Sequence, residues 1–169
     1  GLIAVLVSMG TAAAKPDPPP RLAGLKVLEF TTGGADAKAR LPMVVALHGY
    51  GDRPQNFSRM WRNFPGPARF ILLQAPKEKG RGFSWFTVNR PLTLSDHAVN
   101  HEILAVTNRI VRRVRELVRR RPTEGKPVVT GFSQGGILSL TLALHYPDVF
   151  AAAVPIAGML PARLVGSSM

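Results

Sequence analysis

The chain has 169 residues, of which 46% are hydrophobic and none is cysteine, and its formal net charge is +12. A chain of this size can form one domain with a sizeable core, but not two such domains. Without cysteine neither a disulfide framework nor a thiolate metal site can form, and the redox compartment stays open.

The N-terminal residues do not belong to the predicted core. Residues 1–9 are an apolar run of signal-peptide length, too short to span a bilayer, and three alanines before Lys15 suit a signal-peptidase site. Residues 1–14 are therefore interpreted as a signal peptide remnant of a periplasmic or secreted protein. A buried N-terminal strand and a cytoplasmic protein are the alternatives. Residues 15–21 predict a proline-rich spacer, and residues 22–169 the domain.

Strands and helices alternate along this domain, which predicts an α/β fold with a mostly parallel sheet flanked by helices. Strands are expected at residues 25–31, 43–47, 70–74, 128–131 and 152–156. Helices are expected near residues 54–63, from about 95 to 120, and from 134 to 145. The middle strands are continuous apolar runs, as expected for strands covered on both faces.

The long helix has two contrasting faces. Apolar residues at spacings of three and four indicate a core-facing stripe of Val99, Ile103, Val106, Ile110, Val114 and Leu117. The other face carries Arg109, Arg112, Arg113, Arg115, Arg119 and Arg120. Such a surface attracts nucleic acid or anionic lipid, so a basic anion-binding module is a rival interpretation. We favour a solvated helix face and expect no nucleic acid partner, because no base-stacking aromatic side chains interleave the arginines.

A serine lies where the fourth expected strand meets the last expected helix. Residues 131–136, Gly-Phe-Ser-Gln-Gly-Gly, have the G-x-S-x-G pattern of a nucleophile elbow. The sharp turn holds its serine in a strained backbone conformation, so small residues are needed at Gly131 and Gly135. Ser133 is therefore the candidate nucleophile.

A second glycine-containing turn, residues 48–52, follows the expected strand at 43–47. A turn just past a strand can direct backbone N–H groups at a developing oxyanion, which a nucleophilic serine requires. Alone, this turn is equally compatible with an ordinary strand-to-helix connection. Together with the Ser133 motif, it indicates a serine hydrolase ancestry.

Three motifs resemble the carboxylesterase and acyl-protein thioesterase family of α/β-hydrolases in their order and approximate spacing. They are residues 47–52 (Leu-His-Gly-Tyr-Gly-Asp), 82–86 (Gly-Phe-Ser-Trp-Phe) and 131–136, and the similarity covers about residues 25–161. The resemblance implies an esterase or thioesterase, with no cofactor, in which Ser133 attacks an ester or thioester carbonyl and forms an acyl-enzyme.

The resemblance also implies roles for other residues of these motifs. The backbone N–H groups of Tyr50 and Gln134 would form the oxyanion hole, and Trp85 and Phe86 would line the substrate pocket. The residues that would support the turns are His48, Gly49, Gly131 and Gly135. The implied partner is a small-molecule ester or thioester, with no stable membrane insertion, and the oligomeric state stays open.

The histidines do not supply a clear base. His145 would lie about 18 Å from Ser133 at helical rise, whereas a general base must come within about 3 Å, directly or through one water. His48 is expected to support its turn rather than to act as the base. His97 and His101 open the long helix, where a substitute base is the less favoured alternative. No His, Asp or Glu cluster has the spacing of metal ligands.

Residues 152–156 read as an apolar strand from the interior of a sheet, and few residues follow it. We expect the chain to lack the last strands of the fold together with the catalytic Asp and His, which lie on them in the resembling family. Residues 1–169 alone would then be inactive. The alternative is a pseudo-hydrolase or binding domain that kept the pocket and lost the base.

Overall fold

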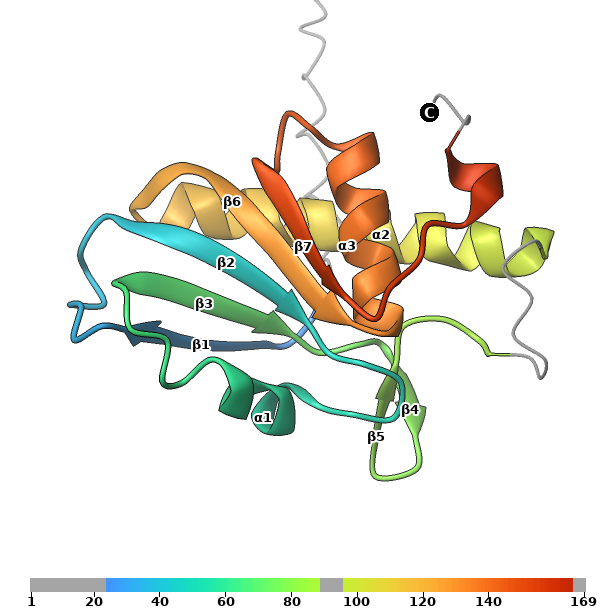
Figure 1. Cartoon of the computed structure of the whole chain (residues 1–169), viewed down its shortest axis with the longest axis horizontal. Coiled ribbons are helices and arrows are strands. Elements are labelled where there is room, and N and C mark those ends of the chain that lie inside the picture. The colour runs from blue at the N-terminus through green and yellow to red at the C-terminus, as the bar shows by residue number, and fades with distance from the viewer. Residues whose placement is uncertain (1–23, 89–95, 166–169) are drawn as a thin grey trace, which may run out of the picture.

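The computed structural model describes residues 24–88 and 96–165 (Figure 1). They form a five-stranded sheet in the order β1-β3-β2-β6-β7 and a separate two-stranded hairpin, β4-β5. The strands are β1 Val27–Thr32, β2 Leu41–Leu47, β3 Ala68–Leu73, β4 Lys77–Lys79, β5 Gly82–Ser84, β6 Thr123–Phe132 and β7 Ala152–Ile156. The helices are α1 Pro54–Phe57, α2 His97–Arg120 and α3 Gln134–His145, with 3-10 turns at Ser58–Met60 and Ala162–Leu164.

The sheet is mostly parallel, as the sequence predicts. β2 pairs in parallel with β3 and β6, and β6 pairs in parallel with β7, whereas β1 is antiparallel to β3. The register places Leu47 opposite Gly131 and Phe132 opposite Ile156. The carboxyl ends of three strands therefore meet at one edge of the sheet, where ligands of open α/β sheets bind.

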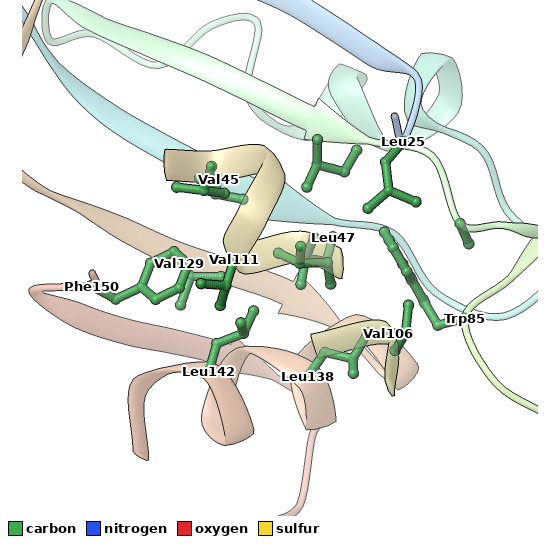
Figure 2. Close-up of a cluster of buried hydrophobic side chains, with 14 of the residues drawn as sticks. Leu25, Val45, Leu47, Trp85, Val106, Val111, Val129, Leu138, Leu142 and Phe150 are labelled. Atoms are coloured by element: carbon green, nitrogen blue, oxygen red, sulfur yellow. The ribbon is translucent and has the colours of Figure 1, made fainter. Parts of the chain in front are cut away.

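Helices cover both faces of the sheet (Figure 1). On one face, α2 and α3 bury a core with inward side chains of β2, β3 and β6, which Figure 2 shows in close-up. All six residues of the predicted apolar stripe of α2 are buried in this core. On the other face, the α1 segment packs the rings of Phe57 and Trp61 near Phe70. Among the described residues, no helix is both long and apolar enough to cross a membrane.

Some elements differ from the sequence expectation where strand pairing decides the outcome. β6 begins at Thr123, five residues earlier than expected, because Thr123 pairs with Leu41 despite an irregularity in the ladder. The helix expected near 54–63 is one short α-helix continued by a 3-10 turn. The sequence pattern predicts no hairpin at β4-β5, because these short strands lack an apolar run. The signal peptide and spacer predicted for residues 1–21 lie outside the described residues.

A buried arginine ties the antiparallel strand β1 to the rest of the sheet. Arg69 on β3 is 1% exposed, and its Nη1 donates to Glu29 Oε1 at 2.7 Å. Its Nη2 donates to the carbonyl oxygens of Ala37 and Ala39. Arg121, just after α2, donates to both oxygens of the same carboxylate. Hydrogen bonds from Arg121, and then from Arg69, hold the pKa of Glu29 below its ordinary value.

We predict that Glu29→Ala lowers the free energy of unfolding by about 3 kcal/mol, because it leaves the buried Arg69 charge without a counter-ion. Urea denaturation at neutral pH measures the loss. The control is Glu116→Ala, which removes a carboxylate that pairs with Arg113 and Arg120 at the surface and should cost clearly less. Equal losses in the two variants would contradict the prediction.

Candidate active site

Ser133 occupies a strained turn between β6 and α3. Its φ is 53° and its ψ is −113°, a conformation that residues with side chains rarely adopt. The turn is held by two bonds, from Ser133 N to Ile156 O and from Ile137 N to Ser133 O, both 2.9 Å. Ser133 is half-buried, and its hydroxyl has no hydrogen-bond partner within residues 24–88 and 96–165. The turn therefore presents an unengaged hydroxyl at the sheet edge.

Two glycines permit the close backbone approach on which this turn depends. A Cβ atom at Gly135 would lie 2.0 Å from Leu47 O and 2.9 Å from His48 O. A Cβ atom at Gly131 would lie 2.3 Å from Gly135 O. Backbone atoms in a packed sheet cannot move aside, so only glycine fits. The start of α3 thus rests directly on the carboxyl end of β2.

The turn at residues 48–52 lies beside this elbow. A Cβ atom at Gly49 would meet the ring of Phe132 at 3.0 Å, which places the turn against the residue before Ser133. Within the described part of the chain, the backbone N–H groups of Tyr50 and Gln134 have no acceptor. The structure therefore brings together two motifs that lie far apart in the sequence, each with an unpaired backbone donor.

The β4-β5 hairpin holds this turn from the other side. Gly51 N donates to Phe83 O at 2.8 Å, and Phe83 N donates to Asp52 O at 2.9 Å. A Cβ atom at Gly82 would lie 2.0 Å from Gly51 O, so the two backbones are in direct contact. The hairpin missing from the sequence prediction is thus part of the frame of the site.

His48 is fully buried, and both of its ring nitrogens have partners. Ala75 N donates to His48 Nε2 at 3.1 Å, so that nitrogen carries no proton, and Nδ1 donates to Gly49 O at 2.7 Å. Burial lowers the pKa of His48 and keeps the ring neutral. Neither ring nitrogen is left to accept a proton from Ser133.

Trp85 and Phe86 lie in the core. They are 1% and 0% exposed, and Figure 2 shows Trp85 among the buried side chains. A cavity of about 130 Å³ touches Trp85 from the side of α2, and its lining does not include Ser133. That both rings line the substrate pocket stays a prediction. Their large apolar surfaces are more stable inside the core, where the indole N–H also finds an acceptor.

The side chain of Gln134 has a structural role that sequence reasoning missed. Its Oε1 accepts from Trp85 N at 3.0 Å, its Nε2 donates to Phe86 O at 2.9 Å, and Ser84 Oγ lies 3.2 Å from Oε1. All of these bonds are buried. No sequence signal marked this side chain, because its partners lie about fifty residues upstream.

The other histidines do not reach the serine. His97 and His101 are exposed on the first turns of α2, and Nε2 of His145 lies 3.0 Å from Leu164 O. Asp148 pairs with Arg115 at the surface, 2.6 Å away. In residues 24–88 and 96–165, no group of three or more His, Asp or Glu side chains could hold a metal ion.

Together, the parallel sheet, the serine elbow and the adjacent glycine turn define an α/β-hydrolase fold. The chain matches the Phospholipase/Carboxylesterase family over residues 34–167, and it belongs to this family. The resemblance seen in the sequence is thereby confirmed.

One curated protein and two solved structures are similar to this chain. Poly(3-hydroxyalkanoate) depolymerase C of Paucimonas lemoignei is 27% identical over 140 residues, which are 79% of this chain and 31% of that protein. The Bacillus cereus carboxylesterase structure has a TM-score of 0.67 at 17% identity, over 83% of this chain and 63% of that one. Zea mays acyl-protein thioesterase 2 has a TM-score of 0.61 at 24% identity, over 85% and 68%. The two structures show the shared fold, and the chain spans about a third of its curated relative.

We predict that Gly135→Ala lowers the free energy of unfolding by more than about 4 kcal/mol or prevents folding, because the added Cβ atom would overlap Leu47 O. The matched control is Gly66→Ala, whose Cβ atom would meet only the Phe64 ring at 3.1 Å. That variant should lose about 1 kcal/mol. Urea denaturation of both variants is the measurement, and a loss below about 1 kcal/mol in Gly135→Ala would contradict the close contact.

The buried, neutral His48 predicts a pH dependence of stability. Its pKa in the folded state lies below the ordinary value of 6.5, so the unfolded chain binds a proton that the folded chain does not. The contribution of the neutral His48 to the free energy of unfolding is present above pH 6.5 and is lost as the pH falls below that value. Urea denaturation at about pH 7.5 and 5.5 should show this loss, and His48→Gln should reduce it. His101→Gln, at an exposed position, should leave it unchanged; an unaltered loss in His48→Gln would refute the assignment.

Proposed function

We propose that this protein is a serine carboxylic-ester hydrolase, an esterase or thioesterase that acts through an acyl-enzyme on Ser133. The observation that carries the proposal is the positive-φ Ser133 at the start of α3, whose hydroxyl has no partner among the described residues. It lies beside the N–H groups of Tyr50 and Gln134, which have no acceptor in the same part of the chain. Ser133 Oγ gives its proton to a base and attacks the carbonyl carbon, and the N–H groups of Tyr50 and Gln134 donate to the oxyanion. The bond to the alcohol or thiol then breaks, and this leaving group departs with a proton. Water hydrolyses the acyl-enzyme, which releases the carboxylic acid and restores the Ser133 hydroxyl.

The substrate class follows from the same chemistry. A backbone oxyanion hole stabilises the tetrahedral intermediate of acyl transfer and needs no metal or other cofactor. The relatives named above are a carboxylesterase, an acyl-protein thioesterase and a depolymerase, which supports an ester or thioester of a small molecule as the substrate. The family assignment supports hydrolysis over the rival nucleic-acid interpretation.

A serine hydroxyl is barely nucleophilic without an adjacent base. Both nitrogens of His48 are engaged, and the Ser133 hydroxyl has no partner among the described residues. We therefore place the base and its acid outside residues 24–88 and 96–165 and expect residues 1–169 alone to be nearly inactive. The unpartnered hydroxyl equally favours a second candidate, a non-catalytic binding domain of the same fold.

A fluorophosphonate probe separates these candidates. In the protein expressed from its complete gene, the probe should label Ser133, as located by peptide mass spectrometry, and Ser133→Ala should abolish the label without loss of folding. Ser139→Ala, at a buried serine of α3, should retain it. Residues 1–169 should label weakly. No labelling of the complete protein would favour the binding domain, and efficient labelling of residues 1–169 that His97→Ala abolishes would reveal a substitute base.

We also propose that the protein is exported to the periplasm or secreted. The support is the apolar stretch followed by three alanines before Lys15. Mass spectrometry of the protein expressed from its complete gene should find a mature N-terminus at or near Lys15. Cytosolic protein that retains residues 2–14 would refute the proposal.

A further inference from the structure

Trp85 connects the two halves of the proposed oxyanion hole. Its backbone N–H donates to Gln134 Oε1 at 3.0 Å, and its indole Nε1 donates to His48 O at 2.8 Å. Gln134 carries one proposed oxyanion donor, and His48 lies two residues before Tyr50, which carries the other. One fully buried residue thus contacts the elbow through its backbone N–H and the glycine turn through its indole N–H.

The bond to His48 also bears on the direction of the Tyr50 N–H group. His48 Nδ1 donates to Gly49 O at 2.7 Å, and that carbonyl belongs to the same planar peptide unit as the Tyr50 N–H. In a trans peptide the C=O and N–H bonds point in opposite directions, so fixing the oxygen fixes the donor. The His48 ring lies 5.3 Å from the Trp85 ring, and both are buried. Trp85 therefore restrains the residue whose imidazole orients the donor.

The second contact restrains the Gln134 donor. Both ends of the Gln134 amide bond the backbone of Trp85 and Phe86, so its side chain cannot rotate without breaking buried hydrogen bonds. Such bonds are strong in a low-dielectric core, and an acceptor left without a donor is costly. The segment that contains Trp85 is anchored in turn by Glu102, which accepts from Thr87 N at 2.6 Å.

We infer that Trp85 is a positioning residue that holds the Tyr50 and Gln134 donors at the separation and orientation the oxyanion requires. The inference rests on the proposed function, because it gives a role to the donors named there. It also accounts for a tryptophan at a position that is 1% exposed. A phenyl ring could fill most of the same space but could not hydrogen bond His48 O.

The chain offers a matched pair of variants for the test. Trp85→Phe removes the indole N–H that bonds His48 O, whereas Trp61→Phe removes a buried indole N–H that has no partner among the described residues. Both changes delete the same atoms from a buried or half-buried ring. The comparison therefore isolates the hydrogen bond from the loss of ring volume.

In the complete protein, Trp85→Phe should lower kcat for p-nitrophenyl acetate about tenfold or more, with KM within about twofold, because a misplaced donor weakens the transition state and not substrate binding. Trp61→Phe should change neither by more than about twofold. Gln134→Met, which removes the side-chain amide and keeps the backbone donor, should lower kcat in the same way. Equal effects of the two tryptophan variants, or a change in KM alone, would overturn the inference.

A second readout does not depend on turnover. In two-dimensional NMR spectra, Trp85→Phe should shift the backbone amide resonance of Tyr50, and Trp61→Phe should not. An unshifted Tyr50 amide would overturn the inference even if the enzyme is active. If the wild-type protein shows no turnover, the proposed function fails, and the amide shifts alone decide whether Trp85 restrains the turn. If Trp85→Phe does not fold, the spectra and kinetics of Gln134→Met decide.

Discussion

The direct contact between the start of α3 and the end of β2 is the constraint on which the site depends. At Gly135 there is no room even for a methyl group, because the Leu47 carbonyl occupies that space. This contact places the helix N-terminus, with its unpaired N–H groups, beside the turn that leaves β2. The positive φ of Ser133 follows from the same geometry, since the chain must reverse sharply between β6 and α3.

A buried hydrogen-bonded unit stabilises this arrangement. The neutral His48 ring, the indole of Trp85 and the amide of Gln134 each hydrogen-bond nearby backbone groups. A charged group at any of these positions would be expensive to bury, whereas neutral donors and acceptors in fixed pairs are not. The candidate site is therefore held by polar groups that are themselves buried. The hairpin β4-β5 completes the frame through its backbone bonds to residues 51 and 52.

Part of the positive charge of the chain is paired with carboxylates within the fold. Arg113 and Arg120 share Glu116, Arg115 pairs with Asp148, and Arg69 and Arg121 share Glu29. The charge of the arginine face of α2 is thus partly neutralised by ion pairs within the fold. The opposite, apolar face of the helix packs on the core. The clearest structural role belongs to Arg121 at the end of the helix, which donates to the Glu29 carboxylate that anchors β1.

The sequence by itself determined the main strands, the apolar stripe of α2 and the position of Ser133. Each of these depends on periodicity or on turn chemistry within a few residues, which a linear pattern contains. The bounds of α3 and β7 could be predicted to the residue for the same reason, because Gly, Pro and apolar runs mark them. The tertiary structure alone decided the start of β6, the hairpin β4-β5 and the burial of Trp85 and Phe86. Those features result from pairing and hydrogen bonding between segments tens of residues apart, and the identity of the neighbouring residues in the chain does not encode such contacts.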